Sequence, residues 1–367
     1  MSYKLLGGGV LVLRDSYDEF PEVDSIAFDC DGTLIDASNS YYLATKLATC
    51  IILKELYGFE CKLGRDFDEA VKFLEMLGGF NNDWNKAAVM IQAIFLHLDD
   101  VKARKNKLEQ IEIESYLKQI SDQESSPQLI KDALAWMKKT ISKNLGKFMT
   151  REDLEKILDE EAEKRGRLNQ LRELREKLGP ITRYGEGMLT TLYDEIYLGE
   201  QGVKAKYGGK PRYVSWGGAI ERERVLINED TLRELQQLIP KGLAIITGRG
   251  RWEVEKTLGR LIDYFNLDAS IFVADQREER EKPDPLLLIE CARRMKSEKI
   301  LYVGDSAEDL IMVKSAVEKG LNALFAGVLT NENALGFFVE KKAEAIMEDV
   351  NDLPRLFKRE EALWKPF

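Results

Sequence analysis

The chain has 367 residues, which is enough for two domains of ordinary size. Hydrophobic residues make up 44% and charged residues 32%, and the net charge at pH 7 is −10. A strongly acidic surface disfavours nucleic acid and anionic membranes, so we expect neither as a partner.

The N-terminal segment, residues 4–13, is predicted to form a strand or hairpin on the core, with a turn at Gly7–Gly9. It is too short for a signal peptide or a membrane span. The four cysteines fit no zinc pattern and imply no disulfide framework; they are Cys30, Cys50, Cys61 and Cys291. A reducing compartment suits such cysteines, so we expect a cytoplasmic protein.

Residues 26–36 carry the first chemical signal, Ile-Ala-Phe-Asp-Cys-Asp-Gly-Thr-Leu-Ile-Asp. An apolar run that leads into Asp29, Asp31 and a Gly-Thr turn predicts a buried strand ending in a loop. In open α/β sheets, ligands bind at the carboxyl ends of the strands. Two neighbouring carboxylates repel each other unless a cation or a proton lies between them. The alternative is a strand-end turn that uses these residues only for local hydrogen bonds.

The next roughly two hundred residues have mainly helical spacing. Helices are predicted over Ser38–Tyr57, Arg65–Leu77 and Trp84–Leu98, and further helical spacing runs from Leu108 to Ile120 and from Leu154 to Leu178. The last helix should end at Gly179-Pro180. Its charged face suits the outer side of a helical bundle better than a coiled coil. The single histidine, His97, is expected on a helix surface or within this bundle, and the chemistry considered below does not need it.

A polar segment, Gly78–Asn85, separates two of these helices. A glycine stop followed by an N-cap at Asp83 would explain one polar residue there. The surplus of short polar side chains suggests instead that Asn81, Asn82 and Asp83 contact a ligand. The sequence leaves both interpretations open.

From Leu243 onward, predicted strands and helices alternate. One strand ends in Thr247-Gly248-Arg249, Lys282 precedes a helix that begins with proline, and another strand ends in the run Gly304–Asp309. Further strands are predicted at 270–273, 323–325 and 344–347. This alternation predicts a Rossmann-like α/β core with a parallel sheet. We expect residues 1–36 and 238–367 to form that core, and residues 37–237 to form an inserted, all-helical cap domain.

The pattern Asp-x-Asp-Gly-Thr-Leu resembles motif one of the haloacid dehalogenase-like superfamily of phosphotransferases. The segments around Thr247, Lys282 and Asp305 resemble its second, third and fourth motifs, in the same order. The helical insertion is similar in position to the type-one cap of that superfamily, although it is larger. The wording of the motifs looks most like the phosphoglycolate-phosphatase-like branch. Four motifs in order, each at a predicted strand end or helix start, argue against a purely structural role.

This resemblance implies a role for each motif residue. Asp29 would be the nucleophile that forms an aspartyl-phosphate. Asp31 would protonate the leaving oxygen and later activate water. Relatives that cleave carbon–halogen bonds lack this second acid, so Asp31 favours phosphate chemistry. Thr247 would donate a hydrogen bond to phosphate, and Lys282 would supply a fixed positive charge.

The resemblance also implies a phosphate-binding set and a metal site. The expected phosphate-binding residues are Gly32, Thr33, Gly248 and Arg249. Mg²⁺ is the expected cofactor because it prefers hard oxygen ligands and keeps several of its waters. Its expected ligands are Asp29, the main-chain carbonyl of Asp31, and Asp305. Asp309 would be either a further ligand or an acceptor for a metal-bound water.

We therefore expect a Mg²⁺-dependent phosphatase that acts on a small phosphorylated metabolite. Its cap would close over the core, exclude bulk water and select the leaving group. One alternative is a phosphomutase that uses the same intermediate, and another is a non-catalytic helical interaction protein on a similar core. The substrate and the oligomeric state, monomer or homodimer, stay open, because a fold does not fix them.

Overall fold

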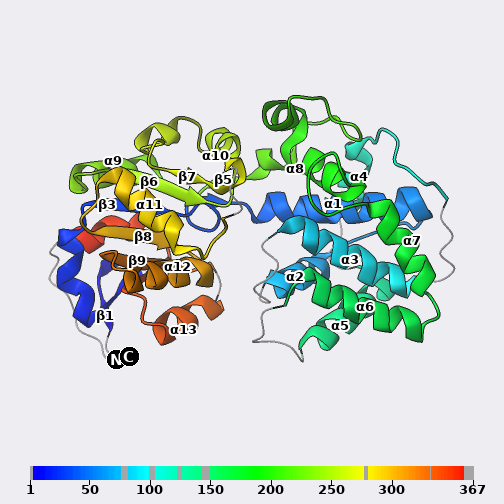
Figure 1. Cartoon of the computed structure of the whole chain (residues 1–367), viewed down its shortest axis with the longest axis horizontal. Helices are drawn as coiled ribbons and strands as arrows, with labels where there is room; N and C mark the ends of the chain where they lie inside the picture. The colour runs from blue at the N-terminus through cyan, green and yellow to red at the C-terminus, as the bar shows by residue number, and fades with distance from the viewer. Residues whose placement is uncertain are drawn as a thin grey trace. The chain divides into compact units, whose positions relative to one another are not determined.

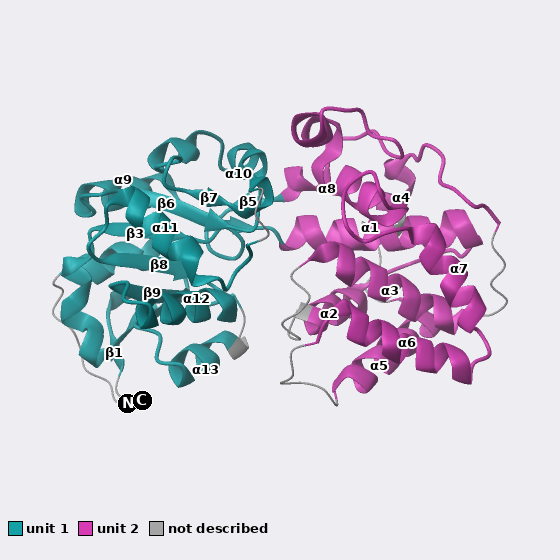
Figure 2. Cartoon of the chain, in the orientation of Figure 1, with its two compact units in different colours: residues 1–37, 223–367 teal, residues 38–222 magenta. Residues whose placement is uncertain are grey.

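A computed structural model describes residues 3–75, 82–98, 104–121, 126–142, 149–276, 280–330 and 332–358. The chain divides into two compact units, shown in different colours in Figure 2. We call residues 1–37 and 223–367 the core unit, and residues 38–222 the helical unit. None of the helices in the described ranges is long and apolar enough to cross a membrane.

The core unit is built on an eight-stranded sheet, visible in Figure 1. Its strand order is β1-β2-β10-β9-β8-β3-β6-β7. The strands are β1 (Tyr3–Leu5), β2 (Leu11–Leu13), β3 (Ser25–Phe28), β6 (Leu243–Thr247), β7 (Ile271–Phe272), β8 (Ile300–Gly304), β9 (Ala323–Val328) and β10 (Ala345–Met347). The strands from β10 to β7 in this order run parallel, and the β1–β2 hairpin adds an antiparallel edge. The predicted α/β fold is confirmed, and the N-terminal hairpin is present.

Strand β3 lies inside the sheet, with β8 on one side and β6 on the other. All four of its residues are buried, because helices cover the sheet and a strand enclosed on both faces has no polar side. The helices of the core unit are α9 (Glu229–Leu238), α10 (Arg251–Leu258), α11 (Pro285–Met295), α12 (Ala307–Glu318) and α13 (Glu332–Glu340). Residues of α11 and α12 share one apolar core with residues of β3, β6 and β8. The carboxyl ends of β3, β6 and β8 therefore meet at one edge of the sheet.

The second boundary of the insertion differs from the predicted one at residue 237. Helix α9 and the short strand β5 (Arg224–Val225) belong to the core unit. The buried side of α9 contacts two 3₁₀ segments of that unit, η4 (Gly259–Tyr264) and η6 (Val350–Phe357). Strand β5 pairs antiparallel with β4 (Ile35–Asp36). The two chain segments that lead into and out of the helical unit thus lie side by side in the core unit.

The helical unit contains α1 (Ser38–Tyr57), α2 (Arg65–Glu75), α3 (Asp83–His97), α4 (Ile113–Ser121), α5 (Gln128–Ser142), α6 (Arg151–Lys164), α7 (Leu168–Leu178), α8 (Met188–Tyr207) and η3 (Ala219–Arg222). Helix α1 has the predicted bounds, and α2 and α3 agree within two residues. Helix α3 is central, because it contacts α1, α5, α6, α7 and α8. Its surroundings explain why every residue of α3 from Lys86 to Leu96 is buried.

The predicted helix from Leu154 to Leu178 is wrong in one respect, since it consists of two helices, α6 and α7. The break contains Gly166, whose φ of +66° lies in the left-handed region that favours glycine. Helix α7 ends at Gly179 as predicted. The segment with predicted helical spacing from Leu108 becomes helical only at Ile113, because Ile111 forms a β-bridge with Val214. Helices α5 and α8 were not predicted.

His97 is held as a neutral ring within the helical unit. Its Nδ1 lies 2.9 Å from the carbonyl oxygen of Ala93, so this nitrogen donates a hydrogen bond. Its Nε2 lies 2.9 Å from Nη2 of Arg165 and accepts one. Burial lowers the pKa of His97 below its ordinary value of 6.5, and the Arg165 charge acts in the same direction.

We expect the stability of the protein to fall as the pH drops below about 6.5. In that range His97 of the unfolded chain binds a proton, whereas His97 of the folded protein stays neutral to lower pH. His97 is the only histidine in the sequence. Its ring proton in a ¹H NMR titration should therefore report one pKa below 6.5. The variant His97→Gln should lose this part of the pH dependence of unfolding. A titration at or above the ordinary value would contradict the neutral ring.

Candidate active site

The loop after β3 sends its two carboxylates in different directions. The amide of Asp29 donates to the carbonyl of Val303 at 2.8 Å, which continues the ladder between β3 and β8. The carbonyl of Cys30 then accepts from the amides of Leu34 and Ile35, both at 2.8 Å, and closes a tight turn. The Asp29 side chain pairs with Lys282, whereas the Asp31 side chain pairs with Arg249. Asp29 and Asp31 therefore have different electrostatic surroundings.

Gly32 is required at the centre of this turn. Its φ is +70°, a conformation that other residues rarely adopt. A Cβ atom at this position would lie 2.2 Å from Oδ2 of Asp305, which is a steric clash. Gly32 thus lets the loop approach the end of β8.

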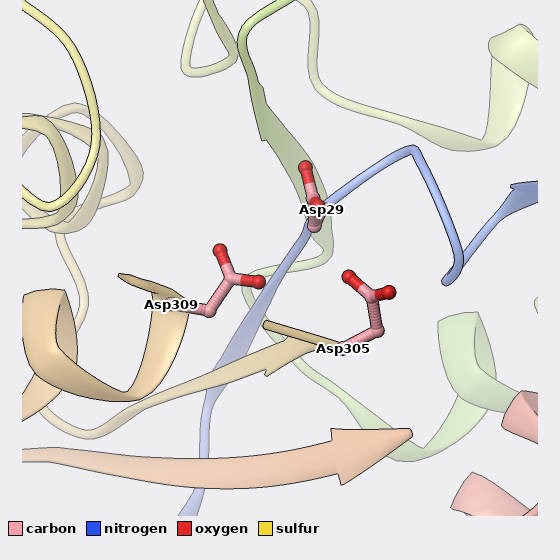
Figure 3. A group of neighbouring side chains, drawn as sticks. All are labelled: Asp29, Asp305 and Asp309. Atoms are coloured by element: carbon pink, nitrogen blue, oxygen red, sulfur yellow. The ribbon is translucent and has the colours of Figure 1, made fainter. Parts of the chain in front are cut away.

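Three acidic side chains converge at this edge of the sheet, as Figure 3 shows. Asp29 follows β3, Asp305 follows β8, and Asp309 lies in the first turn of α12. One oxygen of each carboxylate lies within 4.8 Å of an oxygen of the others. Such a cluster of hard oxygen ligands fits a divalent cation such as Mg²⁺.

Burial makes this cluster costly in the absence of a cation. It raises the pKa of Asp29 to about 7, against the attraction of Lys282 and with the repulsion of Asp309 and Asp31. Burial, together with the charges of Asp29 and Asp309, also raises the pKa of Asp305 well above its ordinary value. Groups with strongly shifted pKa values are concentrated at functional sites. This edge of the sheet is therefore the candidate active site.

Lys282 supplies a permanent positive charge to the cluster. Its Nζ lies 2.5 Å from Oδ1 of Asp29 and 2.9 Å from Oδ1 of Asp309. Burial alone would lower the pKa of Lys282, but the charges of Asp29 and Asp309 raise it well above its ordinary value. The ammonium group is thus fixed beside the proposed nucleophile.

Asp309 is fully buried, and both of its oxygens have hydrogen-bond donors. Oδ1 accepts from Lys282 and from the hydroxyl of Tyr302, which is 3.0 Å away. Oδ2 accepts from the hydroxyl of Ser306 at 2.7 Å and from its amide at 3.1 Å. A direct bond to a metal ion would compete with these contacts. Of the two predicted roles of Asp309, the geometry therefore favours an acceptor for a metal-bound water over a further metal ligand.

The sequence interpretation did not include Tyr302 and Ser306. Ser306 forms a capping box with Asp309 at the start of α12, and its Ser-x-x-Asp spacing is visible in the sequence. The Tyr302 hydroxyl also lies 3.1 Å from the carbonyl of Ile246, so it bridges β8 and β6. A tyrosine inside a buried strand usually needs a partner for its hydroxyl, but the sequence does not identify that partner.

The predicted phosphate-binding residues have mixed surroundings. Thr247 is fully buried, and its Oγ1 accepts from the amide of Arg249 at 3.2 Å. Gly248 is exposed beside it. The amides of Gly32 and Thr33 donate to carbonyls within their own loop, at 2.9 and 3.2 Å. The Thr33 hydroxyl is buried and has no hydrogen-bond partner among the described residues.

Arg249 contacts carboxylates where the sequence predicted a phosphate. Its Nε lies 3.0 Å from Oδ1 of Asp31, and its Nη2 lies 2.5 Å from the same oxygen. Its Nη1 lies 2.8 Å from Oε2 of Glu223. Glu223 was not predicted as part of the site. It lies in the alternating charged run Glu221–Arg224, where no local pattern distinguishes it.

The predicted cap contacts are local where the structure describes them. Asn81 lies outside the described residues. Asn82 is the N-cap of α3, because its Oδ1 accepts from the amide of Trp84 at 2.9 Å. The predicted N-cap at Asp83 is thus one residue too late, and Asp83 forms an ion pair with Lys86 at 2.8 Å. The N-cap geometry favours a structural role for Asn82.

We expect Asn82→Ala to destabilise the protein by about 1 kcal/mol, because an N-cap hydrogen bond is lost. Asn228→Ala is the matched control, since the side chain of Asn228 is the N-cap of α9 and accepts from the amide of Thr231 at 2.7 Å. Both variants should lower the melting temperature and leave the ratio of kcat/KM between two phosphate esters unchanged. A tenfold or larger change in that ratio for Asn82→Ala alone would identify a ligand contact.

Comparisons with known proteins agree with these observations. A family model described as haloacid dehalogenase-like hydrolase matches residues 23–316. Phosphatase Tt82 from Thermococcus thioreducens has a TM-score of 0.53 and 21% identity, and the match covers 90% of this chain and 97% of that chain. A Northeast Structural Genomics Consortium target has a TM-score of 0.57 and 19% identity, with the same coverage of 90% and 97%. At these identities the two structures show similarity of fold alone.

A curated relative shares only part of its length with this chain. Imidazoleglycerol-phosphate dehydratase from Phytophthora nicotianae is 31% identical over 131 residues. The match covers 35% of this chain and 27% of that protein. The activity of the whole relative is therefore not transferred to this chain.

Proposed function

This chain belongs to the haloacid dehalogenase-like hydrolases, and from that premise we propose that it is a Mg²⁺-dependent phosphatase acting through an aspartyl-phosphate on Asp29. The observation that carries the proposal is the group formed by the buried Asp29 and Asp309 with the half-buried Lys282 and Asp305 at the carboxyl edge of the parallel sheet. Ionised groups are rarely kept at such a burial cost for stability alone.

Each reaction step has a residue to perform it. The Asp29 carboxylate attacks phosphorus as the bond from phosphorus to the ester oxygen breaks, and Asp31 gives its proton to that oxygen. Water then attacks the phosphorus of the aspartyl-phosphate, Asp31 takes a proton from this water, and Asp29 is released. Lys282 orients Asp29 and balances negative charge during both transfers.

A bound Mg²⁺ would add positive charge against the phosphoryl oxygens. Asp29, Asp305 and the main-chain carbonyl of Asp31 are the groups proposed to hold it. Asp309 would accept a hydrogen bond from the ion's water shell. The convergence of the three carboxylates supports this assignment.

A phosphomutase is the nearest alternative, because it would use the same intermediate and return the phosphoryl group to the substrate. Measuring free phosphate and isomerised product from the same reaction separates the two enzymes. A non-catalytic interaction protein would produce neither. The retained acid cluster, with its shifted pKa values, supports an enzyme over that second alternative.

The proposed substrate is a small phosphorylated metabolite. A screen with Mg²⁺ should cover sugar phosphates, phosphorylated acids and phosphorylated precursors of amino acids. The name of the curated relative contains a phosphate ester with an imidazole ring, so esters of that class should be included. Release of inorganic phosphate from at least one ester, above a no-enzyme control, would support the proposal. No release from any ester, 4-nitrophenyl phosphate included, would contradict it.

The proposed partners follow from charge and cysteine chemistry. The net charge of −10 supports a protein that does not bind nucleic acid or anionic membranes. All four cysteines are buried and free, which suits a reducing cytoplasm.

A further inference from the structure

A buried chain of ion pairs ends at the proposed general acid. The Arg249 side chain is 2% exposed and that of Glu223 is 0% exposed, whereas that of Asp31 is 40% exposed. Nη1 and Nη2 of Arg249 lie 2.8 and 3.0 Å from the two oxygens of Glu223. Nε and Nη2 of Arg249 contact Asp31 at 3.0 and 2.5 Å. One guanidinium thus bridges two carboxylates through different edges.

A hydroxyl group fixes Glu223, at the end of these ion pairs that is farther from Asp31. Oγ1 of Thr257, in α10, donates to Oε2 of Glu223 at 2.6 Å. Glu223 lies next to β5, Arg249 follows β6, and Asp31 follows β3. Three segments that are distant in the sequence are therefore joined at one guanidinium. Arginine forms such double contacts because its planar N–H groups match the geometry of a carboxylate.

This arrangement suits the positioning of Asp31 better than phosphate binding. An arginine that binds phosphate must offer N–H groups to the ligand, but Glu223 and Asp31 already engage the side chain along both edges. A buried ion pair adds little net stability in comparison with apolar packing. Asp31 itself is partly exposed on a loop, so without a fixed partner its carboxylate would sample several rotamers.

We propose that Glu223 is a positioning residue, which holds Arg249 so that Arg249 holds the Asp31 carboxylate in one orientation for proton transfer. This inference rests on the proposed function, because it concerns the acid–base step of that reaction. Asp31 gives a proton to the leaving oxygen and regains one from water. Arg249 and Glu223 keep their charges throughout and exchange no proton.

The leaving group distinguishes this role from a structural one. Formation of the phosphoenzyme from 4-nitrophenyl phosphate needs little help from an acid, because 4-nitrophenolate is a good leaving group. Hydrolysis of the phosphoenzyme still needs Asp31 as a base. For an alkyl ester such as glycerol 2-phosphate, both steps need Asp31. A misplaced Asp31 should therefore affect the two esters, and the two kinetic constants, unequally.

The test compares Glu223→Gln with the wild type on both esters. We expect kcat/KM for glycerol 2-phosphate to fall tenfold or more and kcat/KM for 4-nitrophenyl phosphate to fall less than threefold. For the aryl ester, kcat should fall tenfold or more, with a burst of 4-nitrophenolate in stopped-flow traces. Thr257→Val removes only the hydroxyl and should give the same pattern with a smaller effect.

Glu344→Gln is the matched control. Glu344 pairs with Lys314 at 2.7 Å and accepts from the amide of Phe325, and its side chain is 15% exposed. This control should lower the melting temperature without any burst or difference between the esters.

Equal losses on both esters and no burst in Glu223→Gln would overturn the inference. If Glu223→Gln does not fold, the absence of the pattern in Thr257→Val overturns it. No phosphate release by the wild type from any ester of the Mg²⁺ screen would overturn the proposed function, and this inference with it.

Discussion

Replacing Asp29 with asparagine should abolish turnover and leave the fold intact. The amide cannot act as the nucleophile, so no phosphoenzyme forms. We expect kcat to fall by roughly 10⁴-fold or more, because only binding and electrostatic contributions remain. Phosphate release from the best substrate of the screen measures this loss. Mass spectrometry of the enzyme during turnover should detect an added phosphoryl group in the wild type alone.

The stability of this variant should change little. Asparagine has nearly the same shape as aspartate, and Lys282 keeps its contact with Asp309. Burial raises the pKa of Asp29 to about 7, so the ionised side chain is costly in the cation-free protein above that pH. A neutral amide removes this cost. We therefore expect the melting temperature at pH 8 without divalent cations to be equal to or higher than that of the wild type.

Asp24→Asn is the matched control at the other end of β3. Asp24 pairs with Lys241 at 2.6 Å and accepts from the amide of Glu298 at 2.9 Å. This change should lower stability and preserve turnover, which is the opposite pattern. A kcat of Asp29→Asn within tenfold of the wild type would contradict the assignment of Asp29 as the nucleophile.

The core of the candidate site could be predicted because its residues lie in short contiguous signals. Asp29 and Asp31 follow an apolar strand, and Asp305 follows another. Strand ends meet at one edge of a parallel sheet, so the sequence alone brought these acids together. Lys282 precedes α11 in a charged run, so the local sequence would equally fit a lysine on the surface. Its ion pairs with Asp29 and Asp309 place it in the site instead.

The contacts of Arg249 could not be predicted because they depend on tertiary packing. Arg249 and Glu223 are 26 residues apart, and Asp31 is 218 residues from Arg249. Each of these side chains has charged neighbours in the sequence that could have been its partner. The assignment of Arg249 to phosphate came from its place in a motif. The structure shows that its guanidinium is already engaged by two carboxylates.

In the helical unit, the sequence predicted α1, α2 and α3 closely, but it missed α5, α8 and the break between α6 and α7. The break between α6 and α7 depends on the positive φ of Gly166, and an isolated glycine in a helical pattern does not by itself show a break. Helix α8 contains Gly199 at a φ of +66°, and glycine-rich loops flank it, so its sequence resembled an irregular segment. The position of α9 in the core unit depends on its contacts with η4 and η6, which local spacing does not encode.

Removal of divalent cations should silence the enzyme, and Mg²⁺ should restore it. The cluster of Asp29, Asp305 and Asp309 places three acids around one point, with Lys282 against two of them. Without a cation, the carboxylates repel one another, and they also repel the negatively charged phosphate ester that must bind beside them. We expect EDTA to lower phosphate release roughly a hundredfold or more, since a metal ion supplies several kcal/mol of charge stabilisation.

Asp305→Asn should reproduce this loss in the presence of Mg²⁺, because a neutral amide is a poorer ligand and the cluster loses one negative charge. Mg²⁺ binds the folded state, so at a hundredfold excess over its Kd it should stabilise the EDTA-treated wild type by about 2.7 kcal/mol. This stabilisation should appear as an increase in the melting temperature. The variant should lose most of that increase. Asp284→Asn is the control, because Asp284 caps α11 and asparagine caps a helix equally well. Full phosphate release in EDTA, or an unchanged Mg²⁺ response in Asp305→Asn, would exclude a metal at this cluster and leave Lys282 as the principal positive charge of the site.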